Sequence, residues 1–138
     1  MKKYRVIEHT ADIGIEAEAD SLEELFEVAA EGMFSFIIDP SLVSEVERRH
    51  VEIDAADLEE LMFSWLNELA YMLGADGLLL SRFDIERVAT TRLEAMVWGE
   101  PIDPDRHRDA EEVKAATYHQ MAVEKREGTW LARIIFDV

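Results

Sequence analysis

The chain has 138 residues, 49% of them hydrophobic, and its 14 Lys and Arg against 31 Asp and Glu give a formal net charge of −17 at pH 7. This length predicts one domain over residues 1–138, and the charge disfavours direct nucleic-acid binding while favouring cations or a basic protein as partners. The absence of cysteine excludes disulfides and thiolate chemistry, so a metal would need oxygen or imidazole ligands.

The first part of the chain is predicted to form two strands and a helix. Residues 4–8 and 13–19 are the strands, because apolar and polar residues alternate along the second. Ser21, with Glu24 three residues later, is a capping box that begins a helix. The apolar face of this helix consists of Leu22, Leu25, Phe26, Ala29, Met33, Phe36 and Ile37. Asp39 and Pro40 are expected to end it.

The rest of the chain is predicted to hold one more helix and five strands. That helix begins at Asp57, with Glu60 in the matching capping position, and ends at Gly74. Its apolar face consists of Leu58, Leu61, Met62, Trp65, Leu69, Met72 and Leu73. The strands are residues 43–53, 78–88, 92–98, 115–125 and 130–138. Residues 99–112 contain two prolines and no apolar period, so we expect the one long, mobile loop there.

Two helices and about seven strands predict an α+β domain of two layers, with both helices packed on a mostly antiparallel sheet. The order strand, helix, strand occurs twice, which suggests a duplicated unit. No apolar run approaches the ~20 residues of a membrane helix, and no signal peptide is evident, so we expect a soluble protein in the cytoplasm.

The end of the chain is the first candidate site. If the last strand is held in the sheet, the Asp137 carboxylate and the terminal carboxylate of Val138 lie within one residue of each other. Two anions this close repel, and a hard divalent cation would relieve the repulsion, Ca²⁺ best and Mg²⁺ or Mn²⁺ next. The alternative is that Asp137 faces solvent beside Arg133 and forms a surface ion pair of small value.

Two other segments carry candidate residues, each a weak signal alone. His9 and Asp12 lie in a turn between strands, where an Asp often hydrogen-bonds its own backbone. His119 would share a strand face with Met121 and Val123, so it is as readily a core histidine as a ligand. Lys114, at the mouth of that strand, is equally consistent with a solvated lysine.

Together, the segments "EHTADIGIEAEADSLEELFEVAAEGMF", "LMFSWLNELAYM", "KAATYHQMAV" and the final "RIIFDV" resemble the archease family. The resemblance runs in the same order over nearly the whole chain. Only residues 99–112 offer nothing to anchor to the family. The resemblance implies a fold of paired strand-helix-strand-strand modules, in agreement with the repeated order.

The resemblance also implies a function. Archeases are accessory factors of the RtcB-type RNA ligase, which joins tRNA halves with GTP and metal ions; they promote its guanylylation and multiple turnover and are not enzymes themselves. Their divalent metal, usually calcium, is held by the acid of the first turn and by the chain end, which here are Asp12, Asp137 and Val138. The residues expected to support this site or to face the ligase are His9, Lys114, Tyr118 and His119.

Two rival interpretations stay open at this point. One is a small metal-dependent hydrolase that uses Asp12, Asp137, His9 and His119 with a metal-activated water. The other is a general chaperone or a modulator of tRNA-modifying enzymes.

Overall fold

The computed structural model describes residues 2–8 and 13–138, which form seven strands, two α-helices and one 3-10 turn. In chain order these elements are β1 Lys3–Glu8, β2 Ile13–Ala19, α1 Leu22–Ile37, η1 Pro40–Leu42, β3 Glu47–Asp54, α2 Leu58–Asp76, β4 Leu78–Ala89, β5 Arg92–Pro101, β6 Ala115–Arg126 and β7 Thr129–Asp137. The α+β class and both predicted helices are confirmed.

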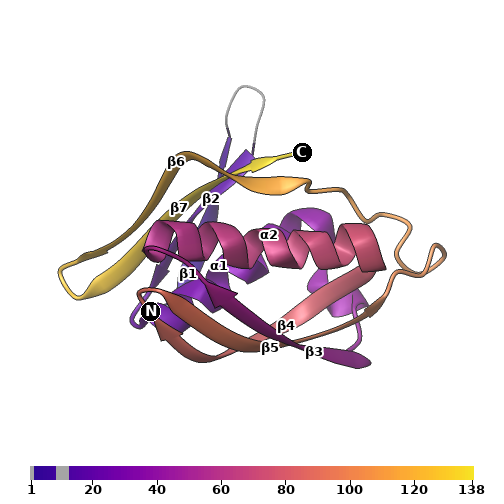
Figure 1. Cartoon of the computed structure of the whole chain (residues 1–138). Coiled ribbons are helices and arrows are strands. Elements are labelled where there is room, and N and C mark those ends of the chain that lie inside the picture. The colour runs from indigo at the N-terminus through magenta and orange to yellow at the C-terminus, as the bar shows by residue number, and fades with distance from the viewer. Residues whose placement is uncertain (1, 9–12) are drawn as a thin grey trace.

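The strands form two antiparallel sheets (Figure 1). Sheet A has the order β1-β2-β7-β6, and sheet B has the order β3-β5-β4. Sheet A therefore joins the first two strands of the sequence to the last two, while sheet B is built from the middle of the chain. The repeated strand-helix-strand order does not assign one half of the chain to each sheet.

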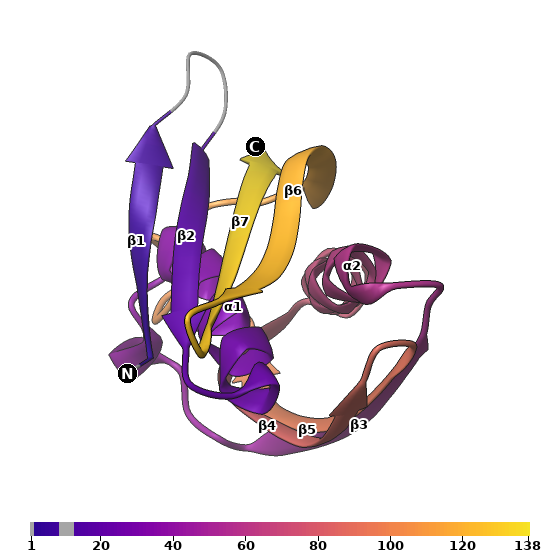
Figure 2. The same cartoon turned by 90° about the vertical axis from the view of Figure 1, so that its left-hand side faces the viewer.

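Both helices lie between the two sheets (Figure 2). Phe34 of α1 packs on Phe83 of β4, with ring centroids 5.5 Å apart, and Phe36 packs on Phe136 of β7 at 5.9 Å. Successive aromatic residues of one helix thus reach opposite sheets. The strands therefore form two sheets instead of the single sheet that was expected. α1 lies between the sheets, so it buries a second side in addition to its predicted apolar face. The additional buried residues there are Val28, Ala30, Gly32 and Phe34.

The helix starts follow the predicted caps. The Ser21 side chain accepts a hydrogen bond from the Glu24 backbone N–H at 3.2 Å, and Asp57 accepts one from Glu60 at 2.8 Å. The second helix runs past Gly74 and stops at Gly77, whose φ of 64° is the left-handed conformation that glycine adopts without strain. Trp65 of α2 is buried in the core, and its indole N–H donates to the Phe26 carbonyl of α1 at 3.0 Å.

Three strands differ from the prediction. β5 ends at Pro101 instead of residue 98, so the first three residues of the predicted loop 99–112 belong to a strand. β3 begins at Glu47 rather than residue 43, because the Asp39 side chain caps the short turn η1 that occupies residues 40–42. β6 contains an irregularity between Thr117 and Ala122, where Gln120 takes a positive φ of 56°. This irregularity breaks the simple alternation of faces that the sequence pattern assumed.

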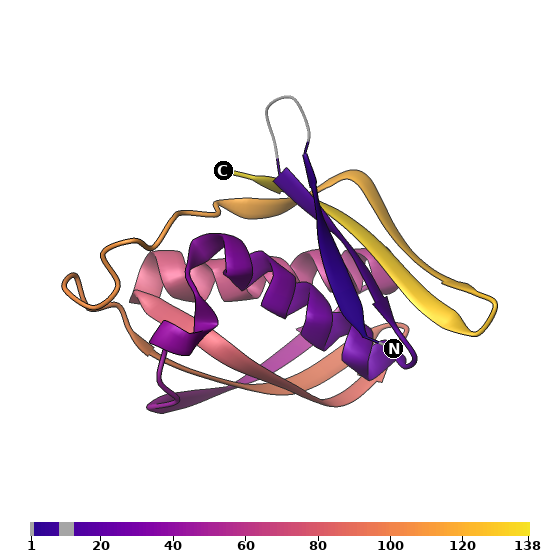
Figure 3. The same ribbon diagram turned by 180° about the vertical axis from the view of Figure 1, so that it is seen from behind.

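The segment between β5 and β6 lies at the end of the molecule opposite the β6–β7 hairpin (Figure 3). It is held by a buried network rather than hanging free. Arg106 donates to both carboxylate oxygens of Glu100, at 2.7 and 3.1 Å, and the buried His107 ring contacts the Leu42 carbonyl at 3.0 Å. The His107 Nδ1 accepts from the Asp103 backbone N–H, so its Nε2 is the donor to Leu42.

Candidate functional site

Three chain segments that are distant in sequence meet at one end of sheet A. Ile13, the first residue of β2, is paired with Phe136 of β7, and Asp137 is paired with Ala115 of β6. The Lys114 backbone N–H donates to the Asp137 carbonyl at 2.9 Å. Figure 2 shows the start of β2, the end of β7 and the start of β6 side by side. Antiparallel pairing thus brings the last strand between the two segments that carry the sequence motifs.

The Asp137 carboxylate is exposed at this end. Arg133, the partner considered for it, instead binds Glu16 at 3.3 Å and Gln120 at 3.0 Å. Within residues 2–8 and 13–138, no hydrogen bond or ion pair holds the Asp137 side chain. Val138 is 47% exposed beside it. The alternative prediction, a surface ion pair between Asp137 and Arg133, is therefore wrong, and the carboxylate oxygens of Asp137 are accessible.

Asp12, the third predicted metal ligand, and His9, which was expected to support the site or to face the ligase, lie outside the described residues. Their participation stays a prediction. The chemistry of the part that is described fits a hard cation, because Asp137 offers exposed carboxylate oxygens and its backbone is fixed by pairing with β6.

Lys114 is one of the residues that line a cleft of about 600 Å³ between the C-terminal ends of both helices and residues 102–114. The apolar wall includes Ile37, Leu73, Ile102 and Val113, and Glu111 and Glu112 also line the cleft. Sequence reasoning missed this cleft, since it depends on how residues 102–114 fold back on the helix ends. The Lys114 side chain is exposed, as a solvated lysine would be, and its role toward a partner stays a prediction.

Tyr118 and His119 lie on β6 beside the irregularity of that strand, and both are exposed. The interpretation of His119 as a core histidine is therefore wrong. It assumed that His119, Met121 and Val123 share one face, whereas the positive φ of Gln120 interrupts the alternation and only Val123 is buried. The Tyr118 ring stacks on Phe63 of α2, with centroids 4.2 Å apart.

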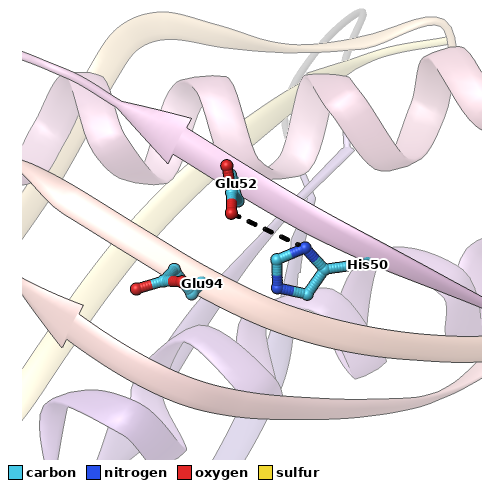
Figure 4. Close-up of side chains that lie close together, drawn as sticks. All are labelled: His50, Glu52 and Glu94. Carbon is cyan, nitrogen blue, oxygen red and sulfur yellow. Dashed lines mark ion pairs between the residues drawn. The ribbon is translucent and has the colours of Figure 1, made fainter.

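A second group of polar side chains lies on the outer face of sheet B (Figure 4). His50, Glu52 and Glu94 each place one ligand atom within 4.8 Å of the others. However, Arg92 contacts Glu52 at 3.4 Å and Glu94 at 3.9 Å, so a cation of the protein already pairs with both carboxylates. This is a surface ion-pair network. The sequence could not indicate it, because it depends on the β3–β5 register, in which Glu52 faces Glu94.

The fold and this end of sheet A define a small acidic α+β protein that presents accessible carboxylate oxygens where the end of β7 lies beside the start of β2. A family model described as "Archease protein family (MTH1598/TM1083)" matches residues 4–138. The chain belongs to the archease family.

The sequences of related proteins match this chain along its full length. The chain is 41% identical to "Protein archease" of Pyrococcus abyssi over 142 residues, which covers 100% of both chains. It is 38% identical to the protein of the same name from Methanosarcina mazei, covering 99% of this chain and 97% of that one.

Solved structures have the same fold. The solution structure of Methanobacterium thermoautotrophicum protein 1598 superposes with a TM-score of 0.83 at 36% identity, over 98% of each chain. The crystal structure of an archease from Thermotoga maritima, described as a "possible chaperone", superposes with a TM-score of 0.66 at 23% identity, over 96% of this chain and 94% of that one, which supports the fold alone. Neither described helix is long and apolar enough to cross a membrane.

Proposed function

We propose that this protein is a metal-binding accessory factor that activates a GTP-dependent RtcB-type RNA ligase in tRNA processing. The observation that supports this most directly is membership of the archease family over residues 4–138. The net charge of −17 suits docking to a basic, RNA-handling enzyme, because complementary charge speeds the encounter of two proteins and orients them. In this role the protein has no catalytic residue of its own.

The proposed metal ligands are Asp12, Asp137 and the carboxylate of Val138. The pairing of Ile13 with Phe136 supports this set, since these residues are the sequence neighbours of Asp12 and Asp137. When bound, a divalent cation, Ca²⁺ in first place, supplies the positive charge that offsets the repulsion between such carboxylates. The backbone bond from Lys114 to Asp137 keeps the end of β7 in position for this purpose. His9, Lys114, Tyr118 and His119 are proposed to support the site or to face the ligase.

Ligase guanylylation, measured with and without the protein, tests this function. Asp12→Ala, Asp137→Ala and a variant with residues added after Val138 are each expected to lose most of the stimulation. Asp109→Ala, which removes the same charge from another exposed position, is the matched control and should stimulate normally. Equilibrium dialysis against Ca²⁺ provides a readout that is independent of the ligase. Undiminished stimulation and Ca²⁺ binding by all three variants would contradict the assignment.

A chaperone role is the second candidate, since the related Thermotoga maritima protein carries that description. It requires affinity for unfolded chains in the absence of any ligase. Suppression of the aggregation of an unrelated denatured protein by equimolar amounts of this one would favour it. A metal-dependent hydrolase, in turn, requires turnover of phosphoester or nucleotide substrates by the purified protein, which we do not expect.

A further inference from the structure

The negative charge of the protein is not spread evenly over its surface. On the outer face of sheet A, Arg5 binds Glu16 at 2.8 Å and Lys3 binds Glu18 at 3.5 Å. On sheet B, Arg92 binds Asp54 at 2.9 Å, and Arg82 binds Asp84 at the same distance. The sheet faces thus largely neutralise their own carboxylates. The excess of acid must lie elsewhere, on the helices and connecting segments.

The start of α2 is one place where carboxylates remain uncompensated. Among the described residues, Asp57, Glu59 and Glu60 take part in no ion pair, in contrast to the carboxylates of the sheets. Asp57 accepts the Glu60 backbone N–H, at 2.8 Å, and Glu60 accepts that of Ala56, at 2.7 Å. The helix N-terminus offsets about half of one elementary charge. Three carboxylates therefore leave this region clearly negative.

A pair of aromatic rings lies beside these carboxylates. Phe63 of α2 and Tyr118 of β6 stack with an interplanar angle of 19°, and Tyr118 is still 50% exposed. Partial burial, followed by the negative charges of Glu60, Asp57 and Glu59, raises the pKa of the Tyr118 hydroxyl. The tyrosine is therefore neutral at physiological pH, and the three carboxylates act electrostatically on an exposed aromatic ring.

We propose that this aromatic-acidic patch, formed by Asp57, Glu59, Glu60, Phe63 and Tyr118, binds an arginine side chain from a segment of a partner protein. The guanidinium group is planar, so it can lie on an aromatic ring and at the same time present paired N–H donors to a carboxylate. Both features meet here, whereas an anionic or purely apolar partner would be opposed by three carboxylates. The patch consists of residues outside the proposed metal ligands, so the inference does not depend on a bound cation.

A short Gly–Arg repeat peptide is the probe, and the same peptide with citrulline in place of arginine is its neutral control. We would titrate each into isotopically labelled protein and follow backbone amide signals by NMR at low salt. The arginine peptide is expected to shift signals of residues 57–63 and 117–119 most, and the citrulline peptide should leave them unchanged. The absence of any shift, or shifts confined to other surfaces, would overturn the proposal.

Variants then separate the patch from the general acidity of the chain. Tyr118→Ala and Glu59→Gln are each expected to weaken peptide binding about three- to tenfold, in line with an exposed cation–π contact or a charge-assisted bond. Tyr118→Phe retains the ring and should bind as the wild type does. Glu23→Gln removes the same charge from the same position in α1, where it lies in the acidic first turn. Equal weakening by Glu23→Gln would show attraction by net charge alone and would overturn the proposal.

Two further measurements complete the test. Thermal unfolding of every variant checks that a loss of binding is not a loss of fold. Asp137→Ala should bind the peptide normally, so that failure of the metal site and failure of this patch give different results.

Discussion

Glu100 is a buried carboxylate that is held by both a side chain and a backbone N–H. It is 6% exposed and accepts two bonds from Arg106 and one from the Ser44 backbone N–H, at 2.6 Å. The Arg106 bonds, with the Ser44 bond next, lower the pKa of Glu100 to about 2. This single side chain connects β5, the segment after η1 and the connection to β6.

The stability of the protein should therefore depend on pH through Glu100. Because its pKa in the folded protein lies below the ordinary value of 4.5, the stabilisation is complete above that pH and is lost as the pH falls toward about 2. At pH 7 we expect Glu100→Gln to lower the free energy of unfolding by about 2 kcal/mol, a value reduced for the solvent exposure of Arg106. Urea unfolding at pH 7 and pH 3 measures this.

The pH dependence also provides the control. The difference between Glu100→Gln and wild type should shrink at pH 3, while the exposed Glu111→Gln should behave as the wild type does at both pH values. A difference that is as large at pH 3 as at pH 7 would mean that the charge of Glu100 is not what stabilises the fold.

Replacement by alanine is expected to have opposite effects on stability at Gly99 and at Gly74. A Cβ atom at Gly99 would lie 1.8 Å from the Leu79 carbonyl oxygen, whereas one at Gly74 would meet nothing within 4 Å. Gly99→Ala must move the β4 backbone, and we expect a loss of about 3 kcal/mol. Gly74→Ala lies inside α2 and should raise stability by up to about 1 kcal/mol, because alanine favours the helix. Equilibrium unfolding of both variants checks this, and equal effects would contradict it.

At the scale of elements, each helix covers the free edge of a strand with a polar side chain. Glu27 of α1 accepts the backbone N–H of Ile85 in edge strand β4, at 2.9 Å. Asn67 of α2 pairs with both backbone groups of Ala116 in edge strand β6, accepting at 2.8 Å and donating at 3.2 Å. Exposed strand edges invite pairing with other chains. These contacts connect the helix layer to the sheets and also protect the edges.

Removal of the Asn67 amide should expose this edge. We expect Asn67→Leu to cost about 1–3 kcal/mol, since both backbone groups of Ala116 lose their partner. Hydrogen exchange of the Ala116 amide should become faster, and unfolding in urea gives the energy. Asn67→Asp keeps the acceptor and should preserve slow exchange at that amide. Unchanged exchange in Asn67→Leu would contradict the capping role.

The helices could be predicted because their start signals are local in the sequence. The features that were missed depend on tertiary contacts. Ser21 and Asp57 indicate where the helices start, because a cap is a hydrogen bond between residues of the same helical turn. The second buried face of α1 was missed because Ala30 and Phe34 lie off the stripe, and only the presence of another sheet buries them. The irregularity at Gln120 has no local signature comparable to a cap, so the face of His119 was assigned wrongly.

The candidate site shows the same division. The adjacency of Asp137 and Lys114 follows from the pairing of β6 with β7, two strands that are consecutive in the chain. By contrast, the place of β7 beside β2 cannot be derived from the spacing of residues, because more than 100 positions separate the two strands along the sequence. The resemblance to a family, rather than any pattern, connected Asp12 to the chain end.

At the scale of the whole molecule, the net charge of −17 opposes folding through self-repulsion. The ion pairs on the sheet faces are exposed, and such pairs contribute little. We therefore expect salt to stabilise the protein: the melting temperature should rise by a few degrees as NaCl increases from about 50 mM to about 500 mM, where the Debye length becomes short. Thermal unfolding followed by circular dichroism measures this. A fall in the melting temperature would show that the ion pairs outweigh the repulsion.

The position of β7 inside sheet A has a consequence for how the protein is made. The last strand of the sequence lies between β2 and β6, so sheet A cannot close until that strand has left the ribosome. Contacts between such distant segments form slowly. During translation β1 and β2 can pack on α1, but the edge of β2 that later binds β7 stays unpaired until the last strand is made.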